Sequence, residues 1–431
     1  MIKNFLSLLA VCALIFLSGC ESAKEPLVGK RTELLEGFSA LTPDVDADNI
    51  NVTVSESILN TDWAQADYGP KNLIPHVDAG TLTNKLWSRS IGQGNGSAGF
   101  LLSTPLVQNE RIFAMDAAGT VSAMNAKTGQ KIWSQQLKSE KFQGCSGGGI
   151  ALGQGRVFVS ASDAGVAALD AETGQILWHR KLVHALRSAP TYYKGRIYVI
   201  TKNNRAISLD AVTGRLLWQQ EGTDHACALL GGAKPAVQGN TVIVPYSSGE
   251  IYAMRRENGF ALWAEALSAI KMFSSTSYVS HIKASPVIDQ DMVFALSQNG
   301  RMVGMRFRNG NIVWEREIKS TTTPLVNESF LYVVTTDQQV ICLVKDSGKI
   351  IWVTSLPKPD GRKKEYVFSG PIMAGGKLIV TSSEGKAFFL KPQTGEMSGE
   401  ISLGRPTFLP PIVADKVAYF LLEDGTLVAY E

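Results

Sequence analysis

The sequence predicts an all-β protein, an eight-bladed β-propeller whose ring is closed by an N-terminal strand. The first observation is a recurring glycine followed four positions later by a tryptophan. The second is the spacing of the successive turn glycines, which lies between 38 and 51 positions. A repeat of about 45 residues with four strand-like runs is typical of a propeller blade rather than of a helical repeat. The six pairs are Gly129 and Trp133, Gly174 and Trp178, Gly214 and Trp218, Gly259 and Trp263, Gly310 and Trp314, and Gly348 and Trp352.

Each repeat unit contains four runs that we expect to form strands. The unit begins at a proline-marked apolar run, as at Pro190, and proline suits a strand start because it has no backbone donor. A β-rich run follows, as at residues 196–200, and a third run follows a Gly or Asn turn, as at 249–254. The fourth run carries the tryptophan, which we interpret as a core residue that stacks against the next blade.

The fourth run is expected to be apolar on both faces. The residue before each tryptophan is aliphatic, as at Leu177 and Val313, and neighbouring residues on a strand point to opposite faces. This pattern suits a sheet that lies between two others.

The two ends of the repeat region together supply the eighth blade. Gly395 keeps the turn glycine, but Gly399 stands where a tryptophan is expected. Trp87 has the pattern of a fourth strand without three strands before it, and residues 411–430 have the pattern of three strands only. Pairing the two fragments leaves no free sheet edge at the seam. Residues 76–431 are therefore predicted to form one propeller domain.

Residues 1–19 have the features of a lipoprotein signal peptide. Lys3 is followed by an apolar run over residues 5–17, which is shorter than a membrane span of about 20 residues. The small residues before Cys20 resemble the bacterial lipobox, which implies cleavage before Cys20 and attachment of acyl chains such as palmitate. The alternative is an ordinary secretory signal with an unrelated cysteine. Residues 20–75 are expected to form a lipid-anchored tether and an N-terminal extension.

Composition and motifs argue against several classes of function. The formal net charge is +3, too small for a nucleic-acid interface, which needs a concentrated basic footprint. The histidines show no close ligand spacing, and we expect no metal site, no cofactor and no catalytic residues. Cys342 is interpreted as a core residue. A disulfide between Cys145 and Cys227 is the alternative to two free thiols.

Residues 168–178 also carry a family resemblance. Their pattern, Ala-x-Asp-x-x-Thr-Gly-x-x-x-Trp, resembles the quinoprotein-alcohol-dehydrogenase-like propeller repeat. PQQ-dependent dehydrogenases share this repeat with the BamB-type lipoproteins of the outer-membrane β-barrel assembly machinery, so it specifies the fold better than the function. The lipobox, the length and the blade count resemble the BamB type. The adjacent cysteine pair of the PQQ dehydrogenases does not occur in the sequence.

The resemblance implies a partner-binding site on the loops that precede the fourth and fifth blades. In the BamB type, a Leu-x-Leu-Arg-Gly loop and an acidic pair contact the periplasmic domains of the barrel-assembly protein. Here Leu229 and Gly231 match, Leu230 stands at the arginine position, and His281 and Lys283 stand at the acidic positions. An apolar contact that lacks the ionic one is therefore expected.

The loop before the fifth blade is also unusually long. The largest glycine spacing, 51 positions, places extra residues between Ser268 and Lys283, among them Met272 and Phe273. Apolar residues on a loop of a rigid scaffold favour contact with a partner. The alternative is a lid that folds over the ring.

The residues and the resemblance together predict a non-enzymatic scaffold lipoprotein, anchored by lipid in the outer membrane and facing the periplasm. Glu21, in place of an aspartate, favours the outer membrane by analogy with lipoproteins generally. The implied partners are the periplasmic domains of the barrel-assembly protein (BamA type) and outer-membrane protein clients. The alternatives are a PQQ-dependent dehydrogenase-like enzyme and a propeller that binds cell-wall or sugar ligands.

Overall fold

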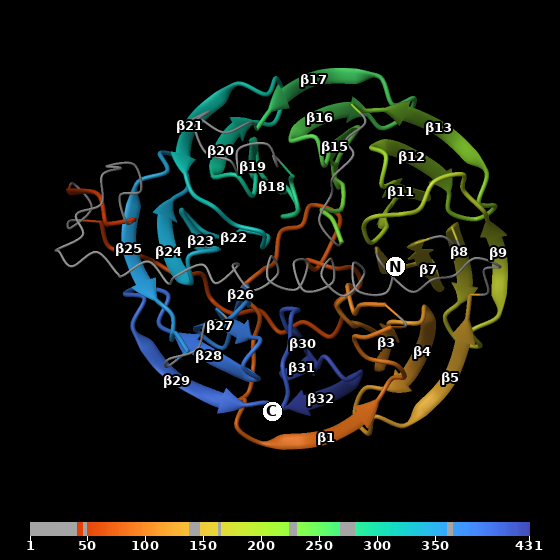
Figure 1. Ribbon diagram of the computed structural model, residues 1–431, viewed down its shortest axis with the longest axis horizontal. Helices are drawn as coiled ribbons and strands as arrows, with labels where there is room; N and C mark the ends of the chain where they lie inside the picture. The colour runs from red at the N-terminus through yellow and green to blue at the C-terminus, as the bar shows by residue number, and fades with distance from the viewer. Residues whose placement is uncertain are drawn as a thin grey trace, which may run out of the picture. The chain divides into compact units, whose positions relative to one another are not determined.

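Eight four-stranded antiparallel sheets form the blades of a ring in the computed structural model (Figure 1). The structure describes residues 41–45, 50–97, 99–137, 147–162, 165–223, 231–267, 281–359 and 365–431. The chain divides into two compact units, Met1–Leu41 and Thr42–Glu431, and the second contains the propeller. The predicted eight-bladed β-propeller is confirmed. Within the described ranges, no helix has the length and apolar character needed to cross a membrane.

Blades 1 to 7 are each continuous in sequence and run from an inner to an outer strand. Blade 1 contains β2 (Leu106–Gln108), β3 (Arg111–Met115), β4 (Thr120–Asn125) and β5 (Lys131–Gln136). Blade 2 contains β6 (Gly148–Gly153), β7 (Arg156–Ala161), β8 (Gly165–Asp170) and β9 (Ile176–Arg180). Blade 3 contains β10 (Thr191–Tyr193), β11 (Arg196–Ile200), β12 (Arg205–Asp210) and β13 (Leu216–Glu221). Blade 4 contains β14 (Ala236–Gln238), β15 (Thr241–Pro245), β16 (Glu250–Arg255) and β17 (Ala261–Ala266).

The remaining blades follow the same plan, except that the last one is assembled from both ends of the chain. Blade 5 contains β18 (Val287–Asp289), β19 (Met292–Leu296), β20 (Arg301–Arg306) and β21 (Ile312–Glu317). Blade 6 contains β22 (Leu325–Asn327), β23 (Phe330–Val334), β24 (Gln339–Val344) and β25 (Ile350–Ser355). Blade 7 contains β26 (Phe368–Ala374), β27 (Lys377–Ser382), β28 (Lys386–Leu390) and β29 (Met397–Ser402). Blade 8 contains β30 (Ile412–Ala414), β31 (Val417–Leu421), β32 (Thr426–Tyr430) and β1 (Lys85–Ser90).

The ring closes through the pairing of β1 with β32. Trp87 lies opposite Ala429, and Ser90 lies opposite Thr426, in an antiparallel register. Beside this pairing, the backbones of Asn84 and Glu431 exchange hydrogen bonds of 3.0 and 2.9 Å. The prediction that an N-terminal strand closes the ring is therefore confirmed, and the edge of β32 is paired at the seam.

A tryptophan on the outer strand links every blade except blade 7 to the next one. Its indole nitrogen donates a hydrogen bond of 2.7–3.1 Å to a backbone carbonyl beside the next blade's hairpin turn, while its ring covers that hairpin's glycine. At Gly214, for example, a Cβ would come within 2.6 Å of the Trp178 ring. The repeated glycine and the repeated tryptophan are thus the two halves of one contact. The donors and acceptors are Trp87 and Ala126, Trp133 and Ala171, Trp178 and Ala211, Trp218 and Arg256, Trp263 and Phe307, Trp314 and Lys345, and Trp352 and Pro392.

The missing tryptophan at Gly399 is explained by the seam. Gly399 lies on the outer strand of blade 7, next to blade 8. In blade 8 the strands β32 and β1 come from opposite ends of the chain, so no hairpin connects them. A tryptophan at this position would therefore have no turn glycine to cover. Instead, the Tyr430 hydroxyl donates a hydrogen bond of 3.3 Å to the carbonyl of Ser402.

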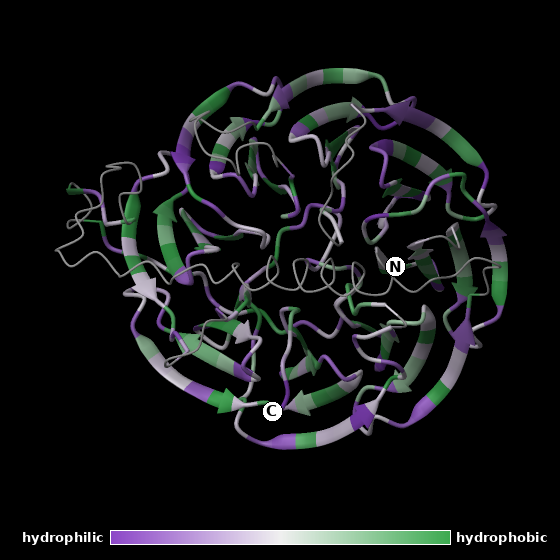
Figure 2. Cartoon of the chain, viewed as in Figure 1, coloured by the Kyte–Doolittle hydropathy of each residue, from purple (hydrophilic) through white to green (hydrophobic). Residues whose placement is uncertain are grey.

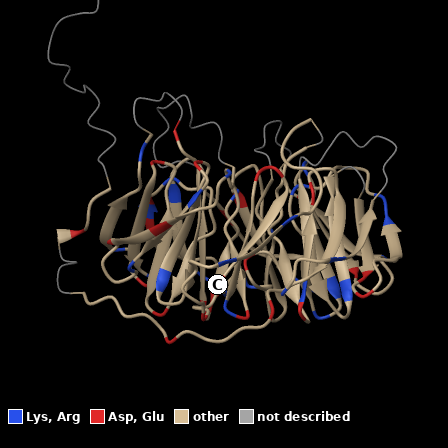
Figure 3. Ribbon diagram, turned by 90° about the horizontal axis from the view of Figure 1, so that it is seen from below, with Lys and Arg blue, Asp and Glu red and all other residues tan. Residues whose placement is uncertain are grey.

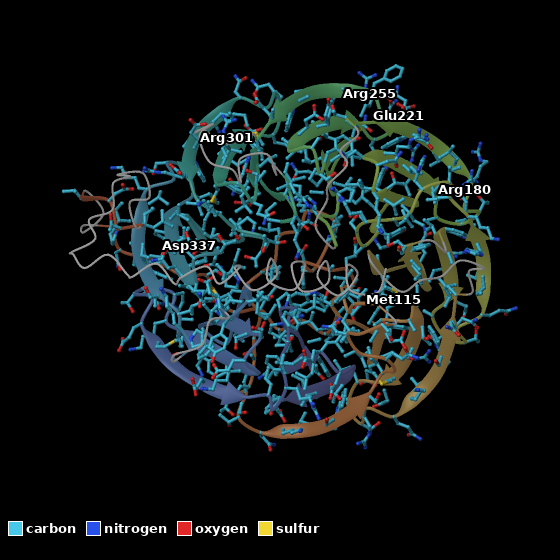
Figure 4. All side chains as sticks on the ribbon, viewed as in Figure 1. Met115, Arg180, Glu221, Arg255, Arg301 and Asp337 are labelled. Atoms are coloured by element: carbon cyan, nitrogen blue, oxygen red, sulfur yellow. The ribbon has the colours of Figure 1, made fainter. Side chains whose placement is uncertain are left out.

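The expectation that the outer strands are apolar on both faces, as if fully enclosed, is wrong. Blades diverge with distance from the axis, so one face of each outer strand meets solvent, and these strands alternate in hydropathy (Figure 2). Charged pairs occupy the same rim, such as Arg301 with Glu315 at 2.8 Å and Arg205 with Glu221 at 2.9 Å. Figure 4 labels one member of each pair, Arg301 and Glu221. Five of the aliphatic side chains that precede a tryptophan are 39–46% exposed, namely Leu86, Ile132, Leu177, Leu262 and Val313.

Residues 50–80, which we call the strap, cross one face of the ring along its lower edge in Figure 3. The strap forms hydrogen bonds with the inner strand of every blade, mostly through backbone groups. It therefore holds the inner ends of all eight blades together. The bonded residues are Ser55 and Asn327 in blade 6, Asn60 and Val413 in blade 8, Trp63 and Val107 in blade 1, Ala64 and Leu152 in blade 2, Gln65 and Tyr192 in blade 3, Pro70 and Val237 in blade 4, Lys71 and Ile288 in blade 5, and Val77 and Met373 in blade 7.

The contact between tryptophan and glycine can be tested with a matched pair of substitutions. Gly214→Ala should lower the free energy of unfolding by about 1–3 kcal/mol more than Gly195→Ala, because only the first adds a steric clash. Both glycines have a positive φ, +68° and +78°, so the backbone cost of adding a side chain is shared, but nothing lies within 4 Å of a Cβ at Gly195. Denaturant titrations of both variants give the comparison. Equal losses would contradict a role for the close contact.

The strap can be tested at Gln65, which is 4% exposed. Its side-chain amide donates to the carbonyl of Tyr192 at 2.9 Å and accepts from the same residue's N–H at 3.1 Å. Gln65→Leu leaves both backbone groups without these partners and should cost about 2–4 kcal/mol of unfolding free energy. Gln136→Leu, at an exposed end of β5, is the control and should stay within about 0.5 kcal/mol of the parent. Similar stabilities of the two variants in denaturant would contradict the role of the strap.

Candidate partner-binding face

The two faces of the ring differ because successive strands in a blade run in opposite directions. Each inner strand runs toward the face that the strap crosses, and the hairpins that hold the turn glycines lie on the same side. The loops that lead from one blade to the inner strand of the next therefore lie on the opposite side. We call this side the loop face. The loops before blades 4 and 5, predicted to bind a partner, belong to it.

Three of the predicted binding residues lie within the described part of the chain, namely Gly231, His281 and Lys283. The other four, Leu229, Leu230, Met272 and Phe273, lie outside it, in residues 224–230 and 268–280. Their part in partner binding remains a prediction.

The predicted cysteine roles divide in the same way. Cys342 is a free thiol, fully buried in β24, which confirms its interpretation as a core residue. Cys20, predicted to carry lipid, lies outside the described residues, as do Cys145 and Cys227. Lipidation and the disulfide therefore remain predictions.

Arg187, in the loop before blade 3, links the two predicted loops below the surface. It is 1% exposed, and its guanidinium donates to the carbonyl of Pro245 at 2.8 Å and lies 3.3 Å from Nε2 of His281. A Cβ on Gly232 would come within 2.6 Å of the Arg187 side chain. Glycine at that position therefore lets the chain before blade 4 lie directly on the arginine. Burial lowers the pKa of Arg187 to about 10, which leaves it charged at neutral pH.

His281 has a different position from the one that a partner contact requires. Its side chain is fully buried against Arg187, so it supports the loop before blade 5 from below. A direct contact between this side chain and a partner would need a rearrangement of the loop.

Lys283 and Lys234 line a cavity of about 240 Å³ at the centre of the ring. Lys234 is 2% exposed, and its Nζ donates to the carbonyl of Gly69 in the strap at 3.0 Å. Burial lowers the pKa of Lys234 to about 8, although Asp67 acts in the opposite direction. Burial also lowers the pKa of Lys283. The cavity is therefore basic on the side formed by blades 4 and 5.

Apolar side chains are exposed around the loop face. Phe100, Val183, Val367 and Phe408 all lie on loops that connect two blades, and they are between 39% and 92% exposed. Val367 and Phe408 also line the central cavity, so the cavity opens on this face. Sequence analysis did not select these residues, because single apolar residues in short loops follow no period. Arg187 could have been suspected from its place beside the proline-marked run of blade 3.

The sequence profile of a family described as outer membrane protein assembly factor BamB matches residues 84–146 and 117–354, which is more than half of the chain. The chain belongs to the BamB family. A BamB relative from Salmonella typhimurium is 30% identical over 362 residues, which cover 83% of this chain and 91% of the relative. The relatives are assembly factors, so family membership confirms the prediction of a non-enzymatic protein.

Solved structures share the fold of this BamB family chain at low sequence identity. BamB from Moraxella catarrhalis has a TM-score of 0.69 at 18% identity, over 80% of this chain and 99% of that one. Quinohemoprotein alcohol dehydrogenase from Comamonas testosteroni has a TM-score of 0.66 at 14% identity, over 86% of this chain and 80% of that one. Such identities show a common fold and do not distinguish a scaffold from a quinone enzyme.

The residues of the cavity do not fit a metal-bound quinone. Asp67 is the one carboxylate among the described lining residues. Across the described ranges, no three His, Cys, Asp or Glu side chains come together in a group that could hold a metal ion. A calcium ion requires six to eight oxygen ligands, usually with several carboxylates.

The burial of Lys234 gives stability a defined dependence on pH. Its folded pKa of about 8 lies below the ordinary lysine value of 10.5. Between these two values the unfolded chain binds more protons, so the free energy of unfolding rises with pH. Above about pH 10, tyrosines whose pKa is raised by burial, such as Tyr246, act in the opposite sense. Denaturant unfolding between about pH 8 and 10 should show the rise, and Lys234→Met should reduce it. A slope that the substitution leaves unchanged would assign the effect to other groups.

Proposed function

We propose that this protein is a lipid-anchored scaffold at the outer membrane that faces the periplasm and supports the assembly of β-barrel proteins by binding other proteins. Its curated relatives carry the name of outer membrane protein assembly factors. Cys20, at the end of a signal-like segment, would carry the lipid. The apolar cost of removing acyl chains from the bilayer, about 0.8 kcal/mol for each CH₂, would keep the protein at the membrane.

The single observation that carries the proposal is the difference between the two faces of the ring. The strap crosses one face and bonds to all eight blades there. The loop face instead exposes apolar side chains, among them Phe100, Val367 and Phe408. Exposed apolar residues on loops of a rigid scaffold favour a protein partner. We infer that partners bind the loop face.

The proposed contact with the periplasmic domains of the barrel-assembly protein uses the loops before blades 4 and 5. Leu229, Leu230 and Gly231 would provide the first part, with Met272 and Phe273 in the second loop. His281 would hold the second loop in place through its contact with Arg187. The contact would be mainly apolar, because Leu230 replaces the arginine expected from the resemblance.

Outer-membrane protein clients are the second proposed partners. Every sheet ends on an outer strand that has one edge without a neighbour in its blade. An extended client segment could pair with such an edge through main-chain hydrogen bonds, as in other cases of strand addition. The exposed alternation of polar and apolar residues along these strands (Figure 2) is compatible with that pairing.

Substitutions on the two faces distinguish partner binding from general damage to the fold. The double change Leu229→Glu and Leu230→Glu, and separately Val367→Glu, should each reduce co-purification with the barrel-assembly complex by about tenfold or more. Phe260→Glu is the matched control, because Phe260 is 63% exposed in a hairpin on the strap side. It should leave recovery unchanged. Full recovery of the complex with both loop-face variants would refute the proposed surface.

A further inference from the structure

We propose that the central cavity binds the carboxylate group of a small ligand whose remaining part is apolar. Lys283 and Lys234 would receive the carboxylate, and the apolar part would lie against Val367 and Phe408 at the mouth. This inference rests on the lining of the cavity and does not depend on the function proposed above.

The first argument is an uncompensated positive charge. Lys283 has no hydrogen bond or ion pair with any of the described residues, although burial is strong enough to lower its pKa. Lys234 has one hydrogen bond, to the Gly69 carbonyl, and the nearby carboxylate of Asp67. The two lysines and one aspartate leave one net positive charge in the lining. The Lys283 side chain is only half-buried, so its ammonium group is partly withdrawn from water without a counterion. A carboxylate ligand would supply that counterion through charge-assisted hydrogen bonds.

The second argument is the arrangement of polar and apolar residues along the cavity. Asp67 of the strap and Lys234 lie on the inner side of the lining, whereas Val367 and Phe408 are 51% and 39% exposed. Phe368 and Leu409 continue the apolar wall beside them. A ligand would therefore place its charged end inward and its apolar end toward the loop face. A ligand that was charged throughout would leave the apolar mouth without a complementary group.

The third argument is size. The cavity holds about 240 Å³, far more than the 10–15 Å³, roughly, that a single water needs. It is smaller than the pockets of drug-sized ligands, which begin at about 300 Å³. The space therefore suits a compact ligand of a few heavy atoms. Arg187 does not take part in this binding site, because its side chain is buried against His281 and Pro245.

Calorimetric titration of the full lipidated protein in detergent tests the proposal with three probes, each corrected by titration into empty micelles. Butanoate carries both features, acetate carries the charge alone, and butanol carries the apolar part alone. We expect saturable butanoate binding with a Kd below about 10 mM. Acetate should bind about tenfold more weakly because it lacks two methylene groups, and butanol should show no saturable binding.

Variants of the lysine complete the experiment. Lys283→Met should weaken butanoate binding by about tenfold or more, whereas Lys283→Arg, which keeps the charge, should retain it. Lys131→Met, on the exposed rim strand β5, is the control and should bind as the parent does. If Lys283→Met fails to fold, the parent protein with the three probes still decides the matter. Equal affinities for acetate and butanoate, an unaltered Kd in folded Lys283→Met, or no saturable butanoate binding would each overturn the proposal.

Discussion

The contact of an indole with the glycine hairpin of the neighbouring blade is the interaction on which the ring depends. It combines a hydrogen bond to a backbone carbonyl with a ring placed where any side chain larger than hydrogen would collide. Because the two partners sit on different blades, the contact sets both the distance and the angle between sheets. The same contact recurs at seven of the eight interfaces between blades, and only the interface of blades 7 and 8 lacks it.

The strap stabilises the inner strands of the blades, near the axis of the ring. Most of the inner strands have only three residues, so their own ladders provide few hydrogen bonds near the axis. The strap adds bonds from Asn60, Gln65 and its own backbone to these inner strands. It also contributes Asp67 and Gly69 beside Lys234, which makes it part of the cavity lining. The same segment therefore supports the fold and provides part of the polar lining of the central cavity.

The ring could be predicted from the sequence because the contact between blades requires a glycine and a tryptophan. These two residue types therefore recur at a regular spacing along the chain. The closing strand was predictable for the same reason, since Trp87 keeps half of the pattern. The exposure of Ile132 and its equivalents was not predictable, because alternation along a strand does not tell how far two blades have diverged. The path of the strap and its bonds to each blade were not predictable, because those bonds come from backbone groups and single amides such as Gln65.

The candidate site was predictable only in outline. The resemblance indicated which loops to consider, and the repeat indicated that they share a face. Arg187 and His281 are 94 positions apart and belong to no recurring pattern. Their contact therefore could not be predicted from the sequence. The basic lining likewise arises because Lys234 and Lys283 belong to adjacent blades that the ring brings together.

Closure of the ring by β1 also affects how the protein is made. The strap and β1 leave the ribosome first, since synthesis proceeds from the N-terminus, yet β1 must wait for β32, which is made of almost the last residues of the chain. The strap can bond to blades 1 and 2 as soon as they form, but β1 has no strand to pair with until β32 is made. A product that stops at Val428 lacks Ala429 and Tyr430, the partners of Trp87 and Lys85, so one end of β1 stays unpaired and open to proteases.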